Sequence, residues 1–210
     1  MKSRLFASGV CASALALAGC ASTTMADDDM ETASASTATT ASASAPNLAP
    51  TATVGGATLS ASRTLADNAM LAPNLSQVVA LIQRANLADT LRGAGPYTLL
   101  APNNDAFTRV PAETMARVNA DPDLLRRALT YHVLPGRFTF DQIKERISAG
   151  GGTATFETVN GNPMRARMQG DLVVLEGENS SIAYLARADV PSSNGLLHVI
   201  NGVLIPPALG

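Results

Sequence analysis

The chain of 210 residues carries a formal net charge of −2 at pH 7 and has no cluster of Lys or Arg, which argues against nucleic acid as a partner. Aromatic residues make up 4% of the chain and Trp is absent, which weighs against stacking platforms for bases or sugars. The length admits one domain or two small ones, but the first third differs in composition from the rest.

Residues 1–19 have the pattern of a targeting segment. Lys2 and Arg4 precede an uncharged run from Leu5 to Ala18, which is typical of a secretory signal and short for a membrane-spanning helix. The run ends in Leu-Ala-Gly-Cys, which resembles the lipobox of bacterial lipoproteins. That resemblance implies that residues 1–19 are removed and that Cys20 is lipidated as the first residue of the mature chain.

Lipidation at Cys20 would place the protein on a membrane, because each buried methylene of an acyl chain contributes about 0.8 kcal/mol. Ala21 follows the cysteine where aspartate is the usual inner-membrane retention signal, so we expect an outer-membrane lipoprotein, periplasmic or surface-exposed. The alternative is a soluble secreted protein in which Cys20 is incidental. Cys11 would leave with the signal, so we expect no disulfide within the mature chain.

Residues 20–66 are rich in Ala, Ser and Thr and show no apolar periodicity. Such a segment cannot bury enough surface to offset its backbone entropy, so we predict a disordered tether followed by one domain over residues 67–210. The acidic run from Asp27 to Glu31 reads as a solvated charge patch, because a flexible run lacks the fixed ligand geometry of a metal site.

Helices are predicted first in the domain, with order beginning near Met70. Asn74 can cap a helix with an apolar stripe from Leu75 to Ala85, and Asn86 can start a second helix that ends at Gly93. Farther along, Asp121-Pro122 provides an acid and a proline at a helix start. A further helix is predicted around residues 142–147.

One early strand is predicted between these helices. Residues 97–101 form a short apolar run between Gly95-Pro96 and Pro102, which is typical of a buried strand. Asn103 and Asp105 can then accept hydrogen bonds from the free N–H groups of a helix start, and Phe107 falls where it packs back onto the sheet.

The last third is predicted to consist of strands and turns. Asn160-Gly161 is a strong hairpin signal, and Asn201-Gly202 predicts a second tight turn into a strand over residues 203–205. The other predicted strands cover residues 131–134, 153–159, 164–168, 172–175, 182–186 and 196–200. Helices first and antiparallel strands later indicate the α+β class.

Three segments in a fixed order resemble the fasciclin domain family: the Gly95–Asn103 block with Ala106-Phe107, the pair Tyr131-His132, and the Asn194–Ile200 block with Val203-Leu204. The resemblance covers residues 70–207. It implies a wedge of two β-sheets with several helices packed on one side. Family members are mostly extracellular or membrane-anchored and act in adhesion rather than catalysis. Asn201 departs from the usual aspartate, and residues 73–76 depart from the usual start of the first helix.

The resemblance also supplies candidate interaction residues. In eukaryotic relatives the tyrosine-histidine motif is associated with integrin adhesion, so Tyr131 and His132 are candidate contact residues. The alternative is that both rings pack and hydrogen-bond within the core. His198 lies between Leu197 and Val199, where an imidazole is expected to satisfy a buried backbone group, and Asp105 is expected to act as a helix cap.

We expect no catalytic residue, metal or cofactor, because the chain lacks Gly-X-Ser-X-Gly, HExxH and cysteine-cluster motifs. The first hypothesis is a non-enzymatic, surface-anchored adhesion module, a monomer that binds a protein, matrix or cell-surface component. The second is a carrier of a small apolar ligand such as a carotenoid or lipid, held in a groove lined by helix aliphatics. An enzyme is the third.

Overall fold

The computed structural model describes residues 49–207. The predicted signal segment, Cys20, the acidic run and the tether up to residue 48 lie outside this range. The strands are β1 Thr51–Val54, β2 Ala57–Ser60, β3 Tyr97–Pro102, β4 Val133–Pro135, β5 Thr153–Glu157, β6 Pro163–Gln169, β7 Leu172–Glu176, β8 Ile182–Ser192 and β9 Gly195–Ile200. The helices are α1 Leu65–Leu71, α2 Ser76–Arg84, α3 Ala88–Arg92, α4 Asn104–Phe107, α5 Ala112–Ala120, α6 Pro122–Tyr131 and α7 Phe140–Ala149, with a 3₁₀ turn at Pro73–Leu75.

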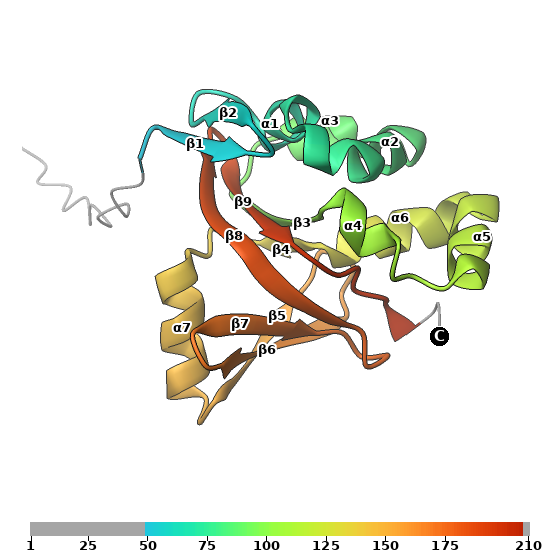
Figure 1. Ribbon diagram of the computed structural model, residues 1–210. Helices are drawn as coiled ribbons and strands as arrows, with labels where there is room; N and C mark the ends of the chain where they lie inside the picture. The colour runs from blue at the N-terminus through green and yellow to red at the C-terminus, as the bar shows by residue number, and fades with distance from the viewer. Residues whose placement is uncertain (1–48, 208–210) are drawn as a thin grey trace, which may run out of the picture. The chain divides into compact units, whose positions relative to one another are not determined.

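Seven of the strands form one mixed sheet in the order β4-β3-β9-β8-β7-β6-β5. The pair β3–β9 is parallel and every other neighbouring pair is antiparallel. The first three residues of β8 pair with β7, and Leu185–Ser192 pair with β9 through two register shifts. Because of these irregularities β8 is shared by two diverging halves of the sheet (Figure 1).

The two edges of this sheet approach each other, so the sheet is nearly closed. Val159, just after β5, donates its N–H to the carbonyl of Val133 on β4 at 2.8 Å. A separate two-stranded sheet is made by β1 and β2. The predicted α+β class, with two β-sheets and several helices, is therefore confirmed. The helices do not all pack on one side, because α7 contacts the second apolar cluster and the other helices contact the first.

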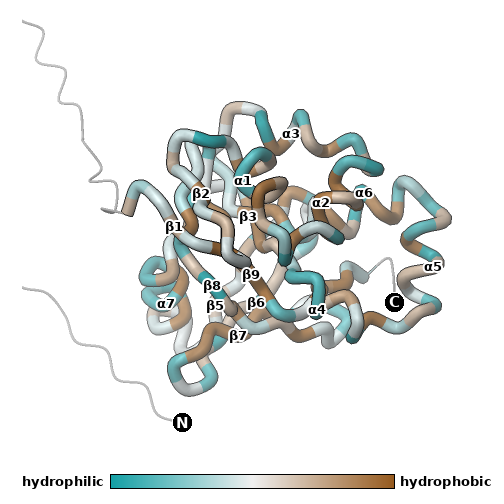
Figure 2. The backbone as a smooth tube through the Cα atoms, turned by 45° about the horizontal axis from the view of Figure 1, so that its top comes forward, coloured by the Kyte–Doolittle hydropathy of each residue, from teal (hydrophilic) through white to brown (hydrophobic). Residues whose placement is uncertain are grey.

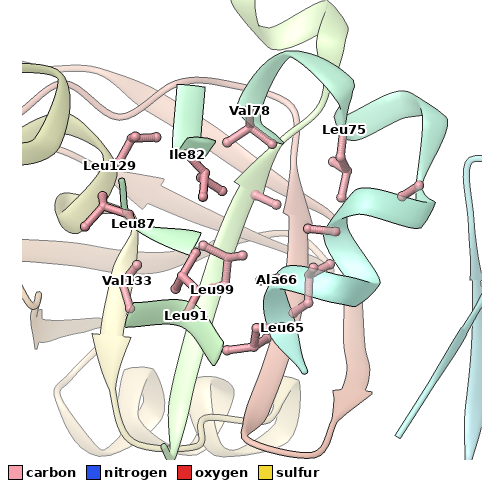
Figure 3. Close-up of a cluster of buried hydrophobic side chains, with 14 of the residues drawn as sticks. Leu65, Ala66, Leu75, Val78, Ile82, Leu87, Leu91, Leu99, Leu129 and Val133 are labelled. Carbon is pink, nitrogen blue, oxygen red and sulfur yellow. The ribbon is translucent and has the colours of Figure 1, made fainter. Parts of the chain in front are cut away.

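Two apolar clusters lie on opposite faces of β3, which explains why its sequence is continuously apolar rather than alternating. Leu99 and Ala101 belong to a first cluster with α1, α2, α3 and α6, whereas Leu100 belongs to a second cluster with α7 and the strands β5 to β8. Figure 3 shows Leu99 and Val133 facing side chains of the surrounding helices in the first cluster. Along α2 and α6 hydrophobic and hydrophilic segments alternate, as expected of helices with one apolar face (Figure 2).

The domain begins earlier than predicted. Residues 51–60, assigned to the tether from their composition, form the β1–β2 hairpin, in which Val54 and Leu59 are buried in the first cluster. Thr64 then caps α1 by accepting from the N–H of Asp67. The predicted tether is therefore wrong for residues 51–66, because two buried aliphatics and tertiary contacts with β8 order a segment of small side chains.

A buried asparagine attaches this hairpin to the rest of the domain. Asn68 on α1 is fully buried, and its Oδ1 accepts from the N–H of Ser60 at 3.0 Å. Its Nδ2 lies 2.9 Å from the Ser60 carbonyl oxygen, 2.9 Å from Ser192 Oγ and 3.2 Å from the Pro191 carbonyl oxygen. One side chain therefore joins β2, α1 and the end of β8.

Three local predictions differ from the structure. Asn74 lies in the 3₁₀ turn, and it is Asn104 Oδ1 that accepts from the N–H of Gln77 in the first turn of α2, at 3.1 Å. Asn86 has a φ of 54°, a left-handed conformation that asparagine tolerates, and it separates α2 from α3 rather than starting a helix. Residues 203–205 follow the predicted turn but form no strand. We call residues 203–206 the C-terminal strap.

Candidate functional site

Tyr131 is the last residue of α6 and is fully buried, with its ring in the second apolar cluster. Its hydroxyl donates to the carbonyl oxygen of Pro163 at 2.9 Å and accepts from the N–H of Glu178 at 3.3 Å. Burial raises the pKa of this phenol above its ordinary value. The side chain therefore links α6 to the start of β6 and to the loop that follows β7.

His132 follows directly and is 4% exposed. Its Nδ1 lies 2.8 Å from the Ala128 carbonyl oxygen, and its Nε2 lies 3.0 Å from the backbone nitrogen of Leu204. Since a carbonyl only accepts and an N–H only donates, this pairing assigns the neutral tautomer with the proton on Nδ1. Burial lowers the pKa of His132 to about 4.

Tyr131 and His132 meet edge to face, with ring centroids 6.5 Å apart. Both rings have their polar atoms bonded to backbone groups, and neither ring is exposed on the described part of the chain. Both side chains therefore support the fold from within the domain. The geometry matches the core alternative weighed in the sequence rather than the contact role.

His198 on β9 is the second buried imidazole. Its Nδ1 accepts from the N–H of Asp189 at 3.0 Å, and its Nε2 lies 2.7 Å from the Phe138 carbonyl oxygen, which assigns the Nε2–H tautomer. Burial lowers the pKa of His198. Asp189, at a φ of 57° in the irregular part of β8, also accepts from the N–H of Phe140. This imidazole therefore satisfies buried backbone groups, the role predicted for it, and fixes the start of α7 against β8.

Of the two residues expected to accept hydrogen bonds at the helix start after β3, Asn103 forms the cap and Asp105 does not. Asn103 Oδ1 accepts from the N–H of Ala106 at 2.9 Å, whereas Asp105 is exposed in the first turn of α4. The expectation that Asp105 caps this helix is wrong, because the cap position is taken two residues earlier. Phe107 is buried in the first cluster, where its spacing predicted it.

Two small apolar clefts flank His132. The first lies between α2, α3, α6 and the β3–β4 pair, and the second lies between α2, α5, α6 and the C-terminal strap. Val78, Leu129 and His132 line both of them. Each has a volume of about 40 Å³, whereas small-molecule sites usually measure about 300–1,000 Å³. Both clefts are therefore much smaller than the sites that usually hold a ligand of the size of a carotenoid or lipid.

Within residues 49–207, no group of three or more His, Cys, Asp or Glu side chains is placed to hold a metal ion. In the same range, no helix combines the length and the apolar character needed to cross a bilayer.

The low pKa of His132 predicts a loss of stability in mild acid. Its folded pKa of about 4 lies below the ordinary 6.5, so the unfolded chain binds a proton first as the pH falls. The free energy of unfolding should fall by about 3 kcal/mol between pH 6.5 and pH 4 from this group, and His198 acts in the same direction. Urea unfolding at about pH 7.5 and about pH 4.5 measures the change. In a His132→Gln variant the free energy of unfolding should depend less steeply on pH. An equal dependence in the variant and the wild type would refute the low pKa of His132.

Comparison with known proteins gives consistent matches. A family model described as the fasciclin domain matches residues 73–206. Transforming growth factor-beta-induced protein ig-h3 of Sus scrofa is 34% identical over 127 residues, which cover 60% of this chain and 17% of that protein. Protein sll1483 of Synechocystis sp. is 35% identical over 136 residues, covering 63% of this chain and 67% of that protein. Cell surface glycolipoprotein MPB83 of Mycobacterium bovis is 34% identical over 126 residues, covering 59% of this chain and 49% of that protein.

Among solved structures, a FAS1 domain pair from the insect cell adhesion molecule Fasciclin I matches with a TM-score of 0.51 and 26% sequence identity. The match covers 62% of this chain and 45% of that chain. This chain therefore spans only part of the pig, mycobacterial and insect proteins that it resembles.

Proposed function

The chain belongs to the fasciclin domain family, and from this premise we propose that it is a non-enzymatic, surface-anchored interaction module. Its partner is another cell, a matrix polymer or another component of the cell envelope. The names of two relatives support this class of function, since one is a cell surface glycolipoprotein and another is a cell adhesion molecule.

The observation that carries the proposal is the burial of the side chains best suited to acid–base catalysis. Tyr131, His132 and His198 are each buried and bonded to backbone groups at their polar atoms. An imidazole acting as a base needs a free lone pair within reach of a substrate, and here each acceptor nitrogen faces an N–H instead. These groups support a rigid body whose outer surface is left for recognition.

We further propose that Cys20 anchors the module to the outer membrane through attached acyl chains. Cys20 lies outside the described residues, and the support for this step is the signal pattern and the lipobox-like ending of residues 17–20. The chain between Cys20 and the hairpin at Thr51 would then separate the lipid from the domain.

Attachment of coated beads to the host's own surfaces tests the interaction half of this proposal. Beads carrying the full chain at matched density should bind intact host cells or host extracellular material well above uncoated beads. Beads carrying the heat-unfolded chain serve as the control, because recognition by a rigid surface is lost on unfolding. Binding no greater than this control would overturn the interaction role.

Fractionation of host cells tests the anchoring half separately. The wild-type chain should appear in the outer-membrane fraction, and Cys20→Ser should move it to the soluble fraction, because the variant lacks the acceptor thiol for the acyl chains. If the Cys20→Ser chain stayed with the membranes, lipid anchoring at this residue would be excluded.

A further inference from the structure

A polar hollow lies away from the two apolar clefts, on the outer face of the half-sheet made by β5 to β8. Its volume is about 590 Å³, within the range of about 300–1,000 Å³ usual for ligand sites. Its floor follows from the strand register, in which Thr155 pairs with Arg165, Arg165 with Glu176, and Glu176 with Ile182. These four side chains form one row across four strands.

The row faces outward because the alternating residues of the same strands point into the second apolar cluster. Phe156, Met164 and Leu175 are buried there, whereas Thr155, Arg165 and Ile182 are exposed. The loop after β7 adds Glu178 and Ser180 to one side of the hollow. The surface thus combines donors, acceptors and an apolar patch at Ile182, whose side chain is 48% exposed.

The charges of the hollow decide which ligand it suits. Glu176 is neutralised by an ion pair with Arg167. Arg165 and Glu178 are exposed, and within residues 49–207 neither side chain forms a hydrogen bond or an ion pair. An anion attracted by the Arg165 guanidinium is repelled by the Glu178 carboxylate. A cation attracted by the carboxylate is repelled by the guanidinium. A neutral ligand rich in hydroxyl groups satisfies both, since a hydroxyl accepts from guanidinium and donates to carboxylate.

Hydrogen bonds fix the loop that carries Glu178. Gly177 donates its N–H to the Ser181 carbonyl oxygen at 2.8 Å, and Glu178 donates its N–H to the Tyr131 hydroxyl. The C-terminal strap adds two bonds, from Asn179 Nδ2 to the Pro206 carbonyl oxygen at 2.8 Å and from the N–H of Ile205 to Ser181 Oγ at 2.9 Å. Fixing a loop before binding lowers the entropy cost of recognition.

We propose that this hollow binds a short segment of a neutral polysaccharide, with Arg165 and Glu178 as the recognition pair and Tyr131 as the positioning residue beneath them. The proposal rests on the interaction role proposed above and names its partner class. Among residues 49–207 no aromatic side chain lines the hollow, so a single site binds weakly through hydrogen bonds. Many copies on one membrane would supply avidity.

Saturation-transfer NMR on the full chain tests this inference. The probes are cellotetraose, maltotetraose, chitotetraose, mannotetraose and the neutral polysaccharide fraction of the host envelope. At least one should bind, and Arg165→Gln or Glu178→Gln should weaken that binding about tenfold, since each removes a charge-assisted hydrogen bond. Arg127→Gln, an exposed arginine on α6 away from the hollow, is the matched control and should bind as the wild type does.

Tyr131→Phe distinguishes positioning from contact. It removes the hydroxyl that holds Glu178 and should weaken saccharide binding several-fold while circular dichroism shows a folded protein. Absence of binding to every probe would overturn the inference, as would binding that neither hollow variant weakens. Binding only to charged peptides, lost in high salt, would also overturn it and assign the hollow to a protein partner. If beads attach to host cells while every saccharide fails, this inference falls and the interaction role stands.

Discussion

Gly195→Ala should lower the free energy of unfolding by about 3–5 kcal/mol, which is a large part of the total stability of a typical domain. Gly195 is the first residue of β9, buried and paired in register with Tyr97 of β3. A Cβ at this position would overlap the carbonyl oxygen of Tyr97 and lie 3.0 Å from Leu65 Cδ1. Because the obstacle is backbone in a central strand pair, the overlap cannot be relieved by turning a side chain.

Denaturant unfolding of Gly195→Ala and Gly161→Ala measures this effect against a matched control. Gly161 lies in the hairpin turn between β5 and β6, where an added Cβ meets open space. Its φ of 84° makes alanine cost only about 1 kcal/mol there. Equal losses in the two variants would show that close approach of β9 and β3 is not the cause.

Asn68→Ala should cost about 3 kcal/mol and release the β1–β2 hairpin before the rest of the domain. The substitution leaves the Ser60 N–H and the carbonyls of Ser60 and Pro191 without the side chain that bonds them. Each buried polar group left unsatisfied costs about 1–3 kcal/mol, reduced where water enters.

Hydrogen exchange followed by mass spectrometry shows where the Asn68→Ala chain opens. Exchange should rise first in residues 51–60, because the hairpin loses its link to β8. Asn119→Ala is the matched control, since the Asn119 side chain is exposed and accepts a hydrogen bond from the exposed Arg84. It should cost less than about 1 kcal/mol. Protection of the hairpin in the Asn68 variant would contradict this role.

The sequence was most informative where local chemistry and tertiary packing agree. The apolar run of β3 between its flanking glycine and prolines predicted a buried strand. Asp121-Pro122 predicted the start of α6, where Asp121 accepts from the N–H of Asp123. The Asn160-Gly161 turn joins β5 and β6 as predicted. These signals depend on neighbouring residues alone, so they can be read without the fold.

The predictions that differ from the structure are those for segments whose conformation depends on residues far away in the sequence. The β1–β2 hairpin consists of small residues whose order comes from Asn68, Val54 and Leu59, and no periodicity in residues 51–60 indicates those contacts. Likewise, the cap-like Asn74 is displaced because Asn104, thirty positions later, bonds the first turn of α2. Tertiary context overrides local propensity in both cases.

At the candidate site, too, local sequence signals were informative and contacts between distant residues were not predicted. The pair Tyr131-His132 could be located from its motif, but the motif does not say whether the rings face inward or outward. That depends on the partners Pro163, Glu178 and Leu204, which lie far along the chain. The polar hollow had no sequence signal at all, because its row of side chains is created by strand register across four strands.

The central claim is that Tyr131 and His132 support the recognition surface from within rather than forming it. Nitrogen NMR of the full chain, with histidine labelled by ¹⁵N, tests this directly, because His132 carries its proton on Nδ1 and His198 on Nε2. The His132 signals should be those of the neutral Nδ1–H form at neutral pH and should change only as the pH approaches about 4. Host surface material that binds the chain should leave them unchanged. Titration near the ordinary 6.5, or a change in these signals when the partner binds, would contradict the claim.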